Sequence, residues 1–187
     1  VYGCSLGGSF AGLLVARQNI RMDFCILGSS DLDQSSKFAA KLKTDLLLPM
    51  IYPLIRDGKL KNRFLQKQTE KRMAQMGEYG KAFMDMLGGA RPYVTKQSCK
   101  NQFYSDLVTP LPDKIDVPGT EIHIFYARKM GEKYRARYLR HFARPVIHEQ
   151  DLQHEELLAC YPEQWAALVK SIACRGGREG GKRYEGQ

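Results

Sequence analysis

The sequence predicts an α/β fold in which a mostly parallel sheet carries a helical insertion. Near the N-terminus, an apolar helix over Phe10–Ala16 precedes a short strand over Asp23–Gly28. Glu121–Ala127 alternates in polarity and is rich in β-forming residues, as expected of a strand. A long block with helical periodicity lies between these two strands. Alternating helices and strands on either side of a helical block are typical of a parallel sheet with an insertion.

The helical block begins after a loop. Residues 28–34 are small and polar, and several of them could cap the next helix. Lys37–Leu48 has apolar residues at four-residue steps, and Met73–Leu87 has them at steps of three and four, so each range predicts an amphipathic helix. Residues 88–92, Gly-Gly-Ala-Arg-Pro, end the second helix. The segment Gln102–Thr109 is consistent with a helix end or a short packed segment.

The C-terminal part returns to alternating elements. After the strand at 121–127, the pattern predicts a helix over Lys133–Phe142, a last strand over Pro145–Glu149 and a final helix over Pro162–Ile172. The resulting organisation is a core of residues 1–33 and 96–173, a helical block of residues 34–95, and a glycine-rich, charged tail at 174–187 that we expect to be disordered.

The segment Gly3-Cys4-Ser5-Leu6-Gly7 has the G-x-S-x-G spacing of a nucleophile elbow, in which a serine occupies a strained turn between a strand and a helix. Glycines two residues before and after the serine leave room for strand and helix to approach. At these residues the chain resembles the α/β-hydrolase fold family. The resemblance implies a nucleophile at Ser5, followed in the sequence by an acid and then by a histidine. It also implies that the helical block of residues 34–95 is the cap that the family inserts into its core.

His154 lies where the resembled family places its catalytic base, between the last strand and the last helix. The other histidines, His123, His141 and His148, fall within strands or a helix and are interpreted as packing residues. The resemblance implies a serine hydrolase acting on an ester or related acyl bond through an acyl-enzyme, with the Leu6 backbone N–H as one oxyanion donor. A non-catalytic binding protein of the same fold, or an inactive fragment of the enzyme, is the alternative.

The acid of the triad is the least determined residue. The family commonly carries it two or three residues beyond the penultimate strand, where this sequence has Lys129 and Met130. Glu132, slightly later in the same turn, is therefore the first choice. The other candidates are Asp106, Asp31 and Asp33, because some family members carry the acid after an earlier strand.

Only Val1 and Tyr2 precede the elbow, whereas the resembled family has most of its sheet and one oxyanion loop before it. We therefore expect the chain to be the C-terminal part of a longer protein, with the second oxyanion donor upstream of Val1. Expressed alone, it should aggregate or pack loosely and lack esterase activity, because the strands on one side of the elbow would be missing.

Composition narrows the class of protein further. Five scattered cysteines without C-x-x-C spacing predict neither a disulfide framework nor a zinc site, so we expect a cytoplasmic protein without metal or other cofactor. The formal charge of +9 is densest over Arg56–Arg72, with seven basic and two acidic residues. We interpret that stretch as a solvated helix face, because only Phe64 could stack on a nucleic-acid base. The expected partner is a small acyl substrate, with neither nucleic acid nor membrane, and the sequence leaves the oligomeric state open.

Overall fold

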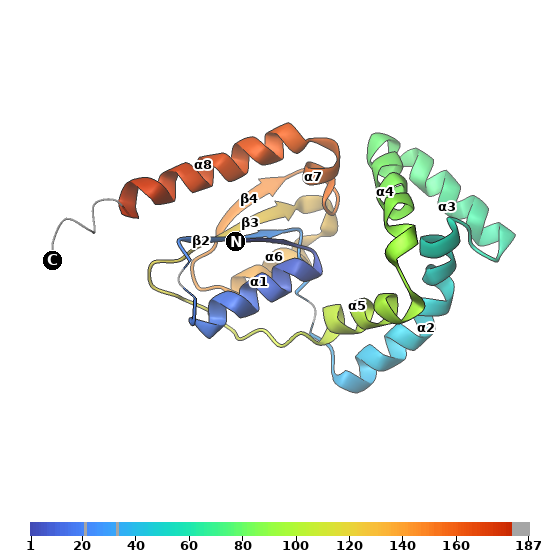
Figure 1. Cartoon of the computed structure of the whole chain (residues 1–187), viewed down its shortest axis with the longest axis horizontal. Coiled ribbons are helices and arrows are strands. Elements are labelled where there is room, and N and C mark those ends of the chain that lie inside the picture. The colour runs from blue at the N-terminus through green and yellow to red at the C-terminus, as the bar shows by residue number, and fades with distance from the viewer. Residues whose placement is uncertain (21, 33, 181–187) are drawn as a thin grey trace. The chain divides into compact units, whose positions relative to one another are not determined.

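The computed structural model describes residues 1–20, 22–32 and 34–180, and for 175–180 only the backbone (Figure 1). The chain divides into two compact units. One contains Val1–Leu32 and the chain from Pro110 onward, and the other contains Asp33–Thr109. The second unit includes residues 96–108, which the sequence pattern assigns to the core.

Among the described residues, a parallel sheet of four strands forms the centre of the first unit, with the strands in sequence order. The strands are β1 (Tyr2–Cys4), β2 (Phe24–Gly28), β3 (Glu121–Ala127) and β4 (Val146–Gln150). The predicted mostly parallel sheet is therefore present, and β3 has the predicted bounds. Since all strands are parallel, their carboxyl ends meet at one edge of the sheet, and the loops that follow Cys4, Gly28, Ala127 and Gln150 gather there.

Helices cover both faces of this sheet (Figure 1). They are α1 (Leu6–Arg17), α6 (Glu132–His141), α7 (Glu156–Cys160) and α8 (Pro162–Gly180), while the short η2 (Arg128–Met130) follows β3. On one face, Val15 of α1 and Tyr138 of α6 pack with Leu27 and Ile124 of the strands. The opposite face is covered by α7 and α8. Alternate strand residues thus contribute to two cores, as the two-residue period of a strand requires.

The final helix differs from its predicted range. We expected it to end at Ile172 and to be followed by a disordered tail, but α8 continues to Gly180. Its packing residues, Trp165, Leu168, Val169 and Ile172, recur at three- and four-residue steps and anchor the helix on the sheet. The helix then continues through residues whose sequence has no apolar pattern. Residues 181–187 of the predicted tail lie outside the described part of the chain.

The unit Asp33–Thr109 is helical throughout its described elements. They are α2 (Lys37–Asp57), α3 (Arg63–Gln75), α4 (Gly77–Ala90), η1 (Arg91–Tyr93) and α5 (Lys96–Val108). The single helix predicted over Met73–Leu87 is wrong, because the chain turns at Met76 and Gly77. Gly77 has a φ of +57°, and the backbone of Gly80 approaches the Met73 carbonyl too closely for a Cβ to fit between them. Apolar spacing continues across this turn, so periodicity alone could not reveal it.

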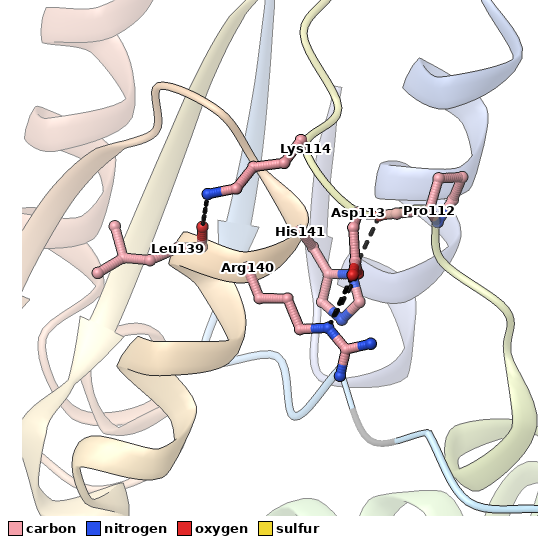
Figure 2. A network of polar contacts seen from close by, with 6 residues as sticks. All are labelled: Pro112, Asp113, Lys114, Leu139, Arg140 and His141. Carbon is pink, nitrogen blue, oxygen red and sulfur yellow. Dashed lines mark hydrogen bonds and ion pairs between the residues drawn. The ribbon is translucent and has the colours of Figure 1, made fainter.

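A polar network joins the loop after Thr109 to the end of α6 (Figure 2). Asp113 accepts hydrogen bonds from Arg140 Nε at 3.0 Å and lies 3.1 Å from His141 Nδ1. The side chain of Lys114 donates to the backbone carbonyl of Leu139 at 2.9 Å. His141 is almost fully buried within this network, so its predicted packing role agrees with its position.

Candidate active site

Ser5 connects β1 to α1 through a strained backbone conformation, with φ of 50° and ψ of −124°. Its N–H donates to the Gly28 carbonyl of the neighbouring strand at 2.9 Å, and its carbonyl accepts from the Gly8 N–H at 3.0 Å. A non-glycine residue at positive φ costs on the order of 1–3 kcal/mol, and such residues cluster at functional sites. This is the geometry expected of a nucleophile elbow, at the carboxyl edge of a parallel sheet where α/β folds bind ligands.

Gly3 and Gly7 were both predicted to leave room for the strand and the helix to approach, but only Gly3 does so. A Cβ on Gly3 would collide with the backbone of Gly7, so Gly3 is needed for the close approach of strand and helix. A Cβ on Gly7 would meet nothing within 4 Å. The tight position on the helix is Gly8, where a Cβ would overlap the side chain of Ser30. The prediction that Gly7 must lack a side chain to leave room is therefore wrong. The Gly7 backbone packs against Gly3, but a side chain on Gly7 would point into open space.

The loop after β2 lies beside the elbow and is held by several hydrogen bonds. Ser29 and Leu32 both adopt positive φ, at 43° and 47°. The Ser30 carbonyl accepts from Tyr138 Oη at 2.6 Å, and the Asp31 carbonyl accepts from Arg137 Nη1 at 2.7 Å. These contacts from α6 fix the backbone that carries the Asp31 side chain.

The loop after β4 brings Glu155 against the elbow. Its N–H donates to Ser29 Oγ at 3.2 Å, and its φ of 58° is left-handed. The carboxyl group faces Tyr2, Cys4 and the backbone of Ser5, and burial raises its pKa from 4.5 to about 7. The Oε1 atom is buried without a hydrogen-bond partner among the described residues. The sequence did not predict a role for Glu155, because a glutamate in a polar loop is usually a solvent-exposed charge.

His154 precedes Glu155, and the negative charge of Asp31 acts on its imidazole. Burial lowers the pKa of His154, whereas the negative charge of Asp31 raises it. The burial effect is the larger, so the imidazole is held more readily in its neutral form. The charge of Asp31, in the loop after β2, therefore acts on the histidine in the loop after β4.

The other predicted acids lie in different surroundings. Glu132 is exposed in the first turn of α6, and its charge acts on Tyr126 and Arg135. Asp106 belongs to α5 in the other unit. Asp33 lies outside the described residues. Among the candidate acids that the structure describes, Asp31 is the one whose charge acts on His154.

Two further histidines form a separate contact within the sheet. His123 Nδ1 lies 3.1 Å from His148 Nε2, and His123 Nε2 lies 3.1 Å from Glu121 Oε2. Both rings belong to the strands β3 and β4 and stack on each other. Their predicted packing role agrees with this position.

Within the described ranges, no group of three or more His, Cys, Asp or Glu residues could hold a metal ion. No helix among the described residues is long and apolar enough to cross a membrane.

The folded chain is similar to a solved structure of a protein assigned to the alpha/beta hydrolase family, from Desulfitobacterium hafniense. The TM-score is 0.63 at 16% sequence identity, over 92% of this chain and 67% of that one. At this identity the likeness concerns the fold alone. No protein-family model and no curated protein sequence matches the chain. The structure therefore has an α/β-hydrolase type of fold, which confirms the predicted fold class.

Proposed function

We propose that this protein is a serine hydrolase that cleaves an ester or related acyl bond, as a carboxylesterase or thioesterase does. In this proposal Ser5 is the nucleophile, His154 the general base, and Asp31 the acid of the triad. Asp31 replaces Glu132, the first choice from the sequence, because the Asp31 charge acts on His154. The substrate is a small acyl compound. The cytoplasm is the proposed location, given the odd number of scattered cysteines.

The observation that carries the proposal is the strained backbone of Ser5. Nothing in the packing of a simple strand-to-helix turn requires a serine with φ of 50° and ψ of −124°. A nucleophile elbow does require it, because the strain presents the Oγ atom at the edge of the sheet. The neighbouring loop that carries His154 is tied to the same edge through the bond from the Glu155 N–H to Ser29 Oγ.

The electrostatics of His154 fit a general base. A base must be neutral to accept the proton of Ser5, and burial favours the neutral imidazole. After the proton transfer the imidazole carries a positive charge, which the Asp31 carboxylate stabilises. Burial thus favours the free base before the reaction, and the nearby carboxylate favours the imidazolium during it.

The reaction then follows the acyl-transfer sequence. Ser5 Oγ attacks the carbonyl carbon while its proton passes to His154, and the carbonyl oxygen becomes an oxyanion. The N–H of Leu6, the first residue of α1, has no acceptor within the helix and can donate to that oxyanion. The leaving group departs with the proton from His154. Water, deprotonated by His154, hydrolyses the acyl-enzyme and releases a carboxylic acid.

The test compares carboxamide variants of two acids in the full-length protein with a short-chain aryl ester. We expect Asp31→Asn to lower kcat by a factor on the order of 10³–10⁴, as loss of a triad acid does. The matched variant Glu132→Gln should stay within a few-fold of the parent. If Glu132→Gln is the inactive one, the acid is Glu132 as first predicted. If neither variant changes the rate, the triad proposal is wrong.

A further inference from the structure

The second half of α2, the loop that follows it and α3 line an open cavity of about 440 Å³ in the unit Asp33–Thr109. Most of its lining is apolar, including Met50, Leu54, Leu60 and Leu65. A cavity of about 150 Å³ lined by aliphatic and aromatic side chains is enough to bind benzene, so this one has room for a longer apolar group. Its volume lies in the range of small-molecule pockets.

The apolar side chains around this cavity are poorly covered. No described residue of α3 is buried, and Met50 is 52% exposed. Helices normally bury one apolar face, since each Å² of apolar surface removed from water contributes about 25 cal/mol. A ligand with an apolar chain would provide the missing cover.

The cavity coincides with the most basic stretch of the chain. Arg56–Arg72 carries a net charge of +5, and two of its cations, Lys61 and Arg72, line the cavity. Within the described part of the chain, neither of them pairs with a carboxylate. An apolar cavity bordered by two unpaired cations is complementary to an anion that carries an apolar tail.

We propose that this cavity binds a single-chain amphipathic carboxylate, a fatty acid monomer, with its tail among the leucines and its head group beside Lys61 and Arg72. A neutral apolar ligand would offer no negative charge to these two cations. A nucleic acid would need stacking partners, and Phe64 is the one aromatic side chain in the basic stretch. Binding requires neither Ser5 nor His154, so this proposal is independent of the hydrolase activity.

The test measures binding of dodecanoate, below its micelle concentration, by titration calorimetry of the full-length protein. The parent carries Ser5→Ala so that turnover cannot interfere. The site variant is Lys61→Gln with Arg72→Gln, and the matched control is Lys67→Gln with Lys71→Gln. Both pairs remove two positive charges from the same basic stretch, but Lys67 and Lys71 do not line the cavity. Circular dichroism verifies that all variants are folded.

We expect saturable binding with one site, at least a tenfold loss of affinity in the site variant, and less than a threefold change in the control. Affinity should rise about fourfold for each methylene between octanoate and dodecanoate, the factor for burying one CH₂ group. Dodecanol should bind at least tenfold more weakly than dodecanoate. Three results would each overturn the proposal. They are an equal loss of dodecanoate affinity in the site and control variants, equal affinities for dodecanol and dodecanoate, and binding of the protein to phosphatidylglycerol vesicles but not to monomeric dodecanoate.

Discussion

Glu155 should destabilise the folded protein at neutral and alkaline pH, and Glu155→Gln should remove this effect. Its carboxyl group is held against Tyr2, Cys4 and the Ser5 backbone, and burial is the main cause of its raised pKa. In the folded state the group therefore binds its proton more tightly than in the unfolded state. Stability falls as the pH rises from 4.5 through about 7, and this loss is complete above that range. Glutamine has the shape of the protonated acid and does not titrate.

The magnitude follows from the two pKa values. A change from 4.5 to about 7, at about 1.4 kcal/mol per pH unit, corresponds to a penalty of about 3 kcal/mol at pH 8. We therefore expect Glu155→Gln to raise the free energy of unfolding by up to about 3 kcal/mol at pH 8. At pH 4 the two proteins should differ by less than about 0.5 kcal/mol, since both side chains are then neutral.

Urea unfolding of the full-length protein at pH 4, 6 and 8 measures this difference. The fluorescence of Trp165 is a suitable signal, because its ring packs on Tyr2 with centroids 5.2 Å apart, and Tyr2 interacts with the Glu155 carboxyl group. Asp85→Asn, at an exposed position of α4, is the control and should show no comparable pH-dependent gain. If Glu155→Gln is less stable than the parent at pH 8, the folded state stabilises the charged carboxylate and the reasoning is wrong.

Two further predictions concern the elbow and the base. Gly3→Ala should destabilise the protein by about 1–3 kcal/mol and abolish ester hydrolysis, because the added Cβ meets the Gly7 backbone. Gly7→Ala should fold and retain activity, because a Cβ there meets nothing within 4 Å. Equal effects of the two substitutions in thermal melts and ester assays would contradict this prediction. The acid limb of the pH profile of kcat/KM should have its midpoint below pH 6.5, because burial lowers the pKa of His154. In the residual activity of Asp31→Asn the midpoint should move to still lower pH, because the charge that raises the pKa of His154 is removed. A midpoint above pH 6.5 in the parent would show that the Asp31 charge outweighs burial.

The sheet could be predicted from the sequence because its signals are local. Glu121–Ala127 alternates in polarity and is rich in β-forming residues, and the observed strand has those bounds. The elbow could also be predicted, since a serine in this turn needs a glycine at Gly3 for steric reasons. The turn at Gly77 was missed, because the apolar spacing of α3 and α4 continues across it.

The candidate site was only partly predictable, because its electrostatics depend on tertiary contacts. Asp31 and Glu132 are both acids that follow a strand, and nothing in their sequence neighbourhoods indicates which one acts on His154. The burial of Glu155 is equally invisible, since it arises when the loop after β4 folds onto β1 and Ser29. The tight packing of Gly8 against Ser30 joins two segments that are 22 residues apart in the sequence.

The central claim, that Ser5 is an activated nucleophile, is tested most directly by labelling the full-length protein with a fluorophosphonate and locating the adduct by peptide mass spectrometry. We predict one adduct, on Ser5, that is lost in Ser5→Ala and forms at least a hundredfold more slowly in His154→Ala. Labelling that is unchanged in His154→Ala, or an intact folded protein that does not react at Ser5, would contradict the account and favour a non-catalytic binding protein.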